Sequence, residues 1–202
     1  MSMTARFILG LIIVAASYFV GSISPATILG KMHGIDIRKE GSGNPGTTNV
    51  LRVLGKKQAA ITLIVDLCKG MVCVFVGMLI SPAVAYTAGA MALIGHCFPW
   101  QFKFKGGKGV ATGIGIMFAV KPSLALILLL IFVIVVAITR YVSLGSIIAT
   151  FVMTGLSLYM IPGFFGYGVI LAAIIITKHR ANIGRLIRGE ESKLSFGGRK
   201  TA

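Results

Sequence analysis

The chain has 202 residues, of which 56% are hydrophobic and only 12% are charged, and its mean hydropathy is +0.92. A soluble domain carries about 25% charged residues, so this composition excludes an ordinary soluble domain. It also excludes a disordered chain, which needs low hydrophobicity. The polar remainder is strongly basic, since 20 Lys and Arg stand against 5 Asp and Glu, for a net charge of +15. Such residues either mark the cytoplasmic loops of a multipass membrane protein or hold an anionic substrate.

Seven apolar runs follow one another along the chain, and each predicts a membrane helix. A crossing needs about 20 mainly apolar residues. The runs cover residues 7–29, 58–80, 82–98, 109–120, 122–139, 144–161 and 163–178. The fourth run is short, so it is either a thin or tilted crossing or a re-entrant segment. We expect an all-α integral membrane protein with about seven transmembrane helices, one of them short. We also expect the whole chain, 1–202, to form one domain, with a flexible tail at 195–202.

The polar stretches between the runs set the expected orientation. With seven crossings, the stretches 31–57, 99–108 and 179–202 fall on one side, and together with Lys178 they hold 16 of the 20 Lys and Arg. Because cytoplasmic loops are enriched in these residues, the N-terminus is predicted to lie outside and the C-terminus in the cytoplasm. None of the three stretches is large enough for a soluble domain, so any chemistry requires the three cytoplasmic loops to act together.

The first polar stretch contains the glycine-rich run GSGNPGTTNVLR at 41–52. Glycines let backbone N–H groups converge on an anion, and Ser42 and Asn44 add side-chain donors. Either threonine of the run is expected to cap a short helix that ends near Gly55. Arg52 on that helix would then direct a fork of donors at a phosphate. The alternative is a plain cytoplasmic turn rich in Gly and Asn.

The second polar stretch ends in GGKG at 106–109, directly before the fourth apolar run. Flexible backbone, a helix N-terminus and one lysine have the physics of a phosphate loop, although the spacing is not that of a Walker A motif. Alternating aromatic residues at 98–104 predict a short hairpin or interfacial strand, or else an aromatic belt at the headgroup level. His96 is either a satisfied buried histidine or a site residue that orients the loop.

The third polar stretch begins with KHRANIGRLIRGE at 178–190. If the last apolar helix continues into it, His179 and Asn182 lie at i and i+3 on one face. The basic residues around them fit a juxtamembrane helix that touches anionic lipid. Lipid binding does not require His179 or Asn182, so this pair is a candidate for chemistry.

Two further pairs lie near these loops. Asp66 and Lys69 stand at i and i+3 inside an apolar run, and intramembrane charges are usually paired, so a structural ion pair is expected. Ser143 and Ser146 stand at the start of the sixth run. They either cap that helix or donate hydrogen bonds to a phosphate.

The chain lacks the residues of several common mechanisms. It contains no His, Cys, Asp and Glu cluster with metal-ligand spacing, no Asp five positions after a His, and no obvious nucleophile triad. A site built from these loops is therefore expected to be rich in donors and poor in bases. Such a site stabilises phosphate and oxyanion charge.

Together, the strings GSGNPGTTNVLR (41–52), GHCFPWQFKFKGGKGVAT (95–112) and KHRANIGRLIRGEE (178–191) resemble the three cytoplasmic motifs of the bacterial acyl-phosphate:glycerol-3-phosphate acyltransferases, the PlsY family. The order and spacing of the motifs and the surrounding spans also match, so the resemblance covers residues 5–194. The resemblance implies transfer of a fatty acyl group from acyl phosphate to the 1-hydroxyl of sn-glycerol 3-phosphate. The products would be lysophosphatidic acid and phosphate, in phospholipid biosynthesis.

The resemblance also implies roles for particular residues. The residues expected to be catalytic are Ser42, Arg52, Lys108, His179 and Asn182. Those expected to bind substrate are Gly41, Gly43, Asn44, Asn49, His96, Gly106, Gly107, Gly109, Thr112, Ser143 and Ser146. Asp66, Lys69 and Glu190 are expected to be structural. No metal or other cofactor is implied, and the expected location is the bacterial plasma (inner) membrane, with the active site facing the cytoplasm.

The expected mechanism is direct attack by the glycerol hydroxyl without an acyl-enzyme, because acyl phosphate is already activated. The proton acceptor is either His179 or a phosphate oxygen of the donor. Expected partners are the two substrates, membrane lipid and the soluble enzyme that makes acyl phosphate, and no nucleic acid. The main alternative is an anion or phosphate transporter, which predicts key residues near the bilayer midplane and broken helices in corresponding halves. A lipid-binding scaffold would explain the basic tail but not GGKG.

Overall fold

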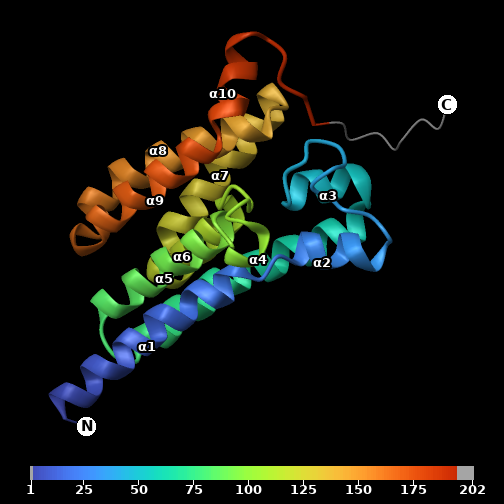
Figure 1. The fold of residues 1–202 in the computed structure, drawn as a ribbon. Helices are drawn as coiled ribbons and strands as arrows, with labels where there is room; N and C mark the ends of the chain where they lie inside the picture. The colour runs from blue at the N-terminus through green and yellow to red at the C-terminus, as the bar shows by residue number, and fades with distance from the viewer. Residues whose placement is uncertain (1, 195–202) are drawn as a thin grey trace.

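The computed structural model describes residues 2–194, and within this range the chain is helical with no strand (Figure 1). The α-helices are α1 (Met3–Ser22), α2 (Pro25–Met32), α3 (Thr47–Val53), α4 (Lys56–Met78), α5 (Pro82–Cys97), α6 (Val110–Val120), α7 (Pro122–Thr139), α8 (Val142–Met160), α9 (Phe165–Lys178) and α10 (Arg180–Ile187). Two 3-10 turns, η1 (Trp100–Phe102) and η2 (Pro162–Phe164), complete the set. The predicted tail at 195–202 lies outside the described residues.

All seven predicted apolar runs are helical. Within the described chain, four spans are long and apolar enough to cross a membrane: Met3–Met32, which joins α1 and α2, and α4, α7 and α8. A fifth is formed if η2, α9 and α10, which bend by 59°, are counted together. The helices α5 and α6, with 16 and 11 residues, are shorter. The all-α prediction is confirmed, and seven crossings remain a prediction.

The first predicted span, 7–29, is not one continuous helix. It breaks at Ile23, where α1 ends and α2 begins with Pro25 at its first turn. The side chain of Ser24 accepts a hydrogen bond from the Thr27 N–H at 3.3 Å and so caps α2. A residue before proline is pushed out of the helical region, and proline is favoured at a helix start. The sequence SPAT therefore ends one helix and starts the next.

Small residues bring the membrane helices close together. A Cβ on Gly95 of α5 would collide with the backbone of Tyr18 in α1, and one on Gly115 of α6 would collide with the backbone of Leu67 in α4. Such close approach is the usual packing mode of membrane helices. The outward faces of α1 and α7 keep large apolar side chains exposed, which suits contact with lipid. The helices α2, α3 and α10 lie at the end of the bundle away from the N-terminus (Figure 1).

Candidate active site

A cavity of about 790 Å³ lies where the three polar loops meet. One part of its wall is polar and draws on every loop. The polar lining includes Ser42, Asn44, Asn49 and Arg52 from the first loop, Lys108 from the second, and His179, Asn182, Arg185 and Glu191 from the third. The three motifs, more than 40 residues apart in sequence, thus form one site.

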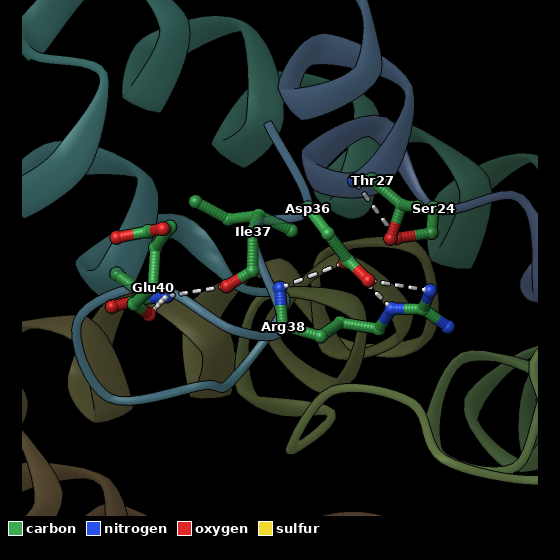
Figure 2. Close-up of polar contacts among 7 residues, drawn as sticks. Ser24, Thr27, Asp36, Ile37, Arg38 and Glu40 are labelled. Atoms are coloured by element: carbon green, nitrogen blue, oxygen red, sulfur yellow. Dashed lines mark hydrogen bonds and ion pairs between the residues drawn. The ribbon is translucent and has the colours of Figure 1, made fainter. Parts of the chain in front are cut away.

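The first loop is held in shape by one buried side chain, Asn49. Its Oδ1 accepts a hydrogen bond from the Ser42 N–H at 2.8 Å. Its Nδ2 donates to the carbonyls of Ile37 at 3.1 Å and Glu40 at 2.9 Å, two residues labelled in Figure 2. Because Asn49 is 1% exposed, these bonds are protected from water. Asn49 therefore fixes the loop backbone and leaves the Ser42 side chain exposed at the cavity.

The short helix that follows, α3, ends as predicted near Gly55, but its cap differs from the prediction. Gly46 stands at the N-cap, with no side-chain hydrogen bond, so neither Thr47 nor Thr48 caps the helix. Both threonines line the cavity instead. A glycine cap leaves the first N–H groups of the helix without a side-chain acceptor. Arg52, on the same helix, is exposed and lines the cavity as expected.

The second loop is a compact turn that presents Lys108. Gly106 and Gly107 donate backbone hydrogen bonds to the carbonyls of Cys97 and His96, at 3.2 and 3.1 Å. A Cβ on either glycine would collide with residues at the end of α5, so the turn requires glycine. The predicted strand at 98–104 is wrong, because the chain forms the 3-10 turn η1 and then enters left-handed backbone at Lys103 and Phe104. Left-handed residues cannot continue an extended strand.

Lys108 reaches across the cavity to the third loop. Its Nζ donates to Asn182 Oδ1 at 2.5 Å. Burial lowers the pKa of Lys108 to about 8, the charge of Glu191 opposes this shift, and the charges of Arg185 and Arg52 add to it. Lys108 is therefore mostly protonated at pH 7, and it loses its charge as the pH rises above about 8.

The third loop brings His179 and Asn182 to the cavity, although the helix is not continuous there. The chain bends by 59° at His179, between α9 and α10. The Nδ1 of His179 contacts the Ile175 carbonyl at 2.8 Å. Since a carbonyl only accepts, Nδ1 carries the proton and Nε2 keeps its lone pair. Burial lowers the pKa of His179 to about 4, so the imidazole is neutral at pH 7.

Glu191 and Arg185 line the cavity but were not predicted as site residues. Glu191 is the centre of their contacts. Its Oε1 accepts from Ser143 Oγ and Asn182 Nδ2, both at 2.6 Å, and its Oε2 accepts from Arg185 Nε at 2.7 Å. Burial acts to raise the pKa of Glu191, but these hydrogen bonds outweigh it and hold the pKa below its usual range. The neighbouring Glu190 forms an exposed pair with Arg188 at 2.7 Å.

The serines of α8 do not cap their helix, since Tyr141 holds the N-cap position. Ser143 donates to Glu191, and Ser146 donates to the backbone carbonyl of Val142 at 2.9 Å. Both line the cavity. The capping alternative is therefore wrong, and the two hydroxyls belong to the cavity wall.

The predicted ion pair between Asp66 and Lys69 is confirmed. Asp66 Oδ1 and Lys69 Nζ are 2.7 Å apart, and both side chains are buried. His96 joins the pair, since its Nδ1 lies 2.7 Å from Lys69 Nζ and 3.3 Å from Asp66 Oδ1. His96 is therefore a buried histidine with a polar partner, as one alternative predicted, and it also lines the cavity. Its role in orienting the loop stays a prediction.

Most of the predicted site residues lie on the cavity wall, and four do not. Those on the wall are Gly41, Ser42, Asn44, Asn49, Arg52, His96, Lys108, Gly109, Ser143, Ser146, His179 and Asn182. Those off it are Gly43, Gly106, Gly107 and Thr112. The three glycines shape turns, and Thr112 is fully buried in α6. Within residues 2–194, no group of three or more His, Cys, Asp or Glu side chains is arranged to hold a metal ion.

The rest of the cavity wall is apolar and draws on the membrane helices. These residues are Leu63, Leu67, Ile114, Phe118, Leu129, Phe132 and Ala149, from α4, α6, α7 and α8. Apolar atoms make up most of the cavity surface. The cavity therefore offers a cationic, donor-rich end and a hydrocarbon-like end to one ligand or to two adjacent ligands.

Comparison with known proteins gives a consistent result. A sequence model of the glycerol-3-phosphate acyltransferase family matches residues 11–189. The chain is similar to the glycerol-3-phosphate acyltransferase of Trichlorobacter lovleyi, with 43% identity over 91% of this chain and 97% of that one. It is also similar to that of Thermoanaerobacter pseudethanolicus, with 46% identity over 92% and 94%.

Two crystal structures have the same fold. Both are of PlsY, described as an integral membrane glycerol 3-phosphate acyltransferase. The glycerol 3-phosphate form gives a TM-score of 0.87 at 38% identity, over 92% of this chain and 96% of that one. The lysophosphatidic acid form gives a TM-score of 0.85 at 36% identity, over 92% and 95%.

Proposed function

The chain belongs to the glycerol-3-phosphate acyltransferase family, and from that premise we propose that it transfers a fatty acyl group from acyl phosphate to the 1-hydroxyl of sn-glycerol 3-phosphate. It is a multipass membrane acyltransferase, like its structurally characterised relatives. The single observation that carries the proposal is the cavity, which joins a cationic end to an apolar end. One substrate of the reaction is a small phosphate and the other has a long hydrocarbon chain.

The cationic end binds phosphate. Lys108 supplies a charge close to Asn182, and Arg52 supplies a fork of donors from the facing loop. Ser42 and the N–H groups at the start of α3 add neutral donors. A hydrogen bond to a charged group contributes about 1.5–3 kcal/mol, so four or five such bonds hold a soluble substrate beside a lipid one.

The apolar end takes the acyl chain. Leu63 and Leu67 of α4 face the same cavity as Leu129 and Phe132 of α7. Because this lining is about as apolar as the lipid tails of the bilayer, it accommodates the chain without any specific contact. With the acyl chain in this part of the cavity, the acyl carbonyl would lie at the boundary between the two ends, next to the polar groups.

The chemical step needs no side-chain nucleophile. The 1-hydroxyl oxygen attacks the carbonyl carbon of acyl phosphate, a new C–O ester bond forms, and the C–O bond to phosphate breaks. The phosphate leaves with the bonding electron pair, and the hydroxyl proton goes to His179 Nε2 or to an oxygen of the departing phosphate. Positioning of the two substrates then supplies most of the rate enhancement.

The structure of His179 supports its role as the acceptor. Its Nδ1–H is engaged by the Ile175 carbonyl, and its low pKa keeps the imidazole neutral at pH 7. Its Nε2 is thus free to take a proton. A pKa of about 4 also makes it a weak base, so the proton passes readily from imidazolium to phosphate.

The expected location is the bacterial plasma membrane, with the cavity facing the cytoplasm. The basis for this orientation is the Lys and Arg bias of the three polar loops. A labelling tag placed after Ala202 should react with a membrane-impermeant reagent from the cytoplasmic side only. Labelling from the outside would show that the proposed orientation is wrong.

The reaction is tested with purified protein in detergent. Acyl phosphate and glycerol 3-phosphate should together release phosphate and form lysophosphatidic acid, while glycerol in place of glycerol 3-phosphate should be a poor acceptor. Acyl phosphate carrying a labelled acyl group, given without acceptor, should leave no label on the protein. If folded protein releases no phosphate, the proposed reaction is wrong. If the protein itself becomes labelled, the proposal of direct attack is wrong.

A further inference from the structure

The first and second loops both line the cavity, yet within residues 2–194 no hydrogen bond or ion pair joins the segment 31–57 to the segment 98–109. The first loop rests on the start of α4 instead, through a small apolar core. That core contains Ala26, Ile37, Val50 and Ala59. Because this core does not reach the second loop, it does not by itself hold Arg52 opposite Lys108.

An aromatic contact supplies the missing link between the two loops. The guanidinium carbon of Arg38 in the first loop lies 5.0 Å from the ring centroid of Phe102, the last residue of η1. A guanidinium within about 6 Å of an aromatic centroid is attracted by the ring. Both side chains are half-buried, so water weakens the attraction less than it would at an exposed site.

Asp36 holds Arg38 in place for this contact. Its Oδ1 accepts from Arg38 Nε at 2.9 Å, and its Oδ2 accepts from Arg38 Nη2 at 3.0 Å (Figure 2). Oδ1 also accepts from the backbone N–H of Arg38 at 3.1 Å. A fork of this kind binds a carboxylate along the edge of the guanidinium plane, so the flat face stays free for Phe102. Asp36 thus fixes the backbone and the side chain of Arg38 together.

The second loop, in turn, is tied to α1. Gln101 Nε2 donates to the carbonyl of Ser22 at 2.6 Å, and Tyr18 Oη donates to the carbonyl of Phe98 at 2.9 Å. Ser22 is the last residue of α1, where backbone carbonyls have no partner within the helix. The ring of Phe102, next to Gln101, therefore stands on a turn that is fastened to a membrane helix.

The segment that carries Arg38 is connected to the site through Asn49. Two carbonyls of that segment, on either side of Arg38, accept from Asn49 Nδ2 at 3.1 and 2.9 Å. Asn49 Oδ1 accepts from the Ser42 N–H, and Asn49 itself belongs to α3, which carries Arg52. A shift of Arg38 would therefore move both Ser42 and Arg52 relative to the second loop.

We propose that Asp36, Arg38 and Phe102 are positioning residues, which together form a clamp between the first loop and the second. The clamp keeps Arg52 and Lys108 at the separation that one substrate phosphate requires. None of its three residues is part of the cavity lining, so the clamp acts through Arg52 rather than by touching substrate. The inference rests on the proposed function, because it takes the ligand between these loops to be a phosphate.

Replacing the ring tests the clamp by kinetics. Phe102→Leu keeps an apolar side chain but removes the aromatic face, so KM for glycerol 3-phosphate should rise about three- to tenfold while kcat stays within about twofold. Phe102→Tyr keeps the face and should stay within about twofold of the wild type in both parameters. Trp100→Leu, at an exposed aromatic residue of the same turn, is the matched control and should change neither. An unchanged KM in Phe102→Leu would overturn the inference.

A second kinetic test separates positioning from a merely structural role. If the clamp acts by placing Arg52, its loss should matter less once the fork of Arg52 is gone. In an Arg52→Lys background, Phe102→Leu should therefore raise KM less than about twofold. An equal rise in KM in both backgrounds would overturn the inference. Where Phe102→Leu fails to fold, Arg38→Lys, which loses the fork to Asp36, replaces it in both backgrounds.

Distances between spin labels test the clamp without any reaction. The labels are placed at Lys39→Cys and Lys105→Cys, two exposed positions of the first and second loops, in protein whose exposed Cys68 is replaced by Ser. We expect one narrow distance distribution in otherwise unchanged protein and a broader one when Phe102→Leu is added. Equal widths would overturn the inference. Wild-type protein that releases no phosphate would instead overturn the proposed function, because the spin-label distances do not depend on turnover.

Discussion

Two walls of the cavity are built in different ways. On the first, which we call the bonded wall, the side chains hold one another. Lys108 donates to Asn182, and Glu191 accepts from Ser143, Asn182 and Arg185. These hydrogen bonds hold the side chains in position before any substrate binds.

The second, which we call the loop wall, is the segment 41–52. Asn49 fixes its backbone, but the side chains of Ser42 and Arg52 are exposed and make no hydrogen bond to the described chain. Preorganised donors cost no reorganisation during reaction, whereas a free side chain loses rotamer entropy on binding. The bonded wall should therefore govern kcat, and the loop wall should govern KM.

The largest expected effect comes from the bonded wall. Lys108→Ala removes a half-buried cation that donates to Asn182, and kcat/KM should fall about 10²–10³-fold, mostly in kcat. The rate of phosphate release at several substrate concentrations measures kcat and KM. The matched control is Lys105→Ala, an exposed lysine of the same loop, which should retain wild-type activity. Full activity in Lys108→Ala would contradict the expectation that the bonded wall governs kcat.

The second effect concerns proton transfer. His179→Gln should lower kcat about 10²-fold and remove the acid limb of the pH–rate profile near pH 4. His33→Gln, at an exposed histidine outside the cavity, serves as the control and should leave the profile intact. An unchanged profile in His179→Gln would assign proton acceptance to the phosphate.

The third effect is a pH dependence with a definite sign. Burial lowers the pKa of Lys108 to about 8, so the free enzyme loses this charge as the pH rises. Above pH 8, kcat/KM, which reports the free enzyme, should fall about tenfold per pH unit. Lys108→Arg keeps its charge at every accessible pH and should remove the alkaline limb. A limb that persists in Lys108→Arg belongs to another group.

The fourth effect tests the loop wall. Arg52→Lys keeps the charge but loses the fork of donors, so KM for glycerol 3-phosphate should rise about tenfold while kcat stays close to wild type. The control is Arg188→Lys, at the exposed residue that follows α10, which should change neither parameter. A fall in kcat alone would place Arg52 with the bonded wall.

The smallest expected effect on activity compares two adjacent carboxylates. Glu191→Gln replaces an acceptor of three hydrogen bonds, so the melting temperature in detergent should fall by about 3–10 °C and kcat by only a few-fold. Glu190→Gln, in an exposed ion pair, should change neither, because exposed pairs contribute about 0–1 kcal/mol. Equal effects from both variants would show that the hydrogen bonds of Glu191 do not stabilise the bonded wall.

The helices could be predicted from the sequence because a run of about 20 apolar residues has few other stable forms. The break at Ile23 was missed although Ser24 and Pro25 carry the local chemistry for it, since the apolar run continues through them. The aromatic alternation at 98–104 predicted a strand as one of its alternatives. A strand needs a neighbouring strand to pair with, and none lies among residues 2–194. The residues after Pro99 form a 3-10 turn instead.

The site is harder to predict because it depends on distances between loops. The meeting of Lys108 and Asn182 follows from the family motifs rather than from any local pattern. Glu190 and Glu191 are chemically identical, and only the chain direction after the left-handed Gly189 decides which one enters the cavity. A glycine directly after the last helix is the one sequence feature that could have signalled this reversal.

The joining of a cationic end to an apolar end in one cavity has a consequence for turnover. Under the proposed reaction, lysophosphatidic acid covalently links the two parts that the substrates bring separately. A linked ligand gains effective concentration at its second subsite, so the product should bind more tightly than either substrate. The catalytic rate would then depend on escape of the product into the bilayer, and an enzyme that consumes lysophosphatidic acid would relieve inhibition by drawing it away.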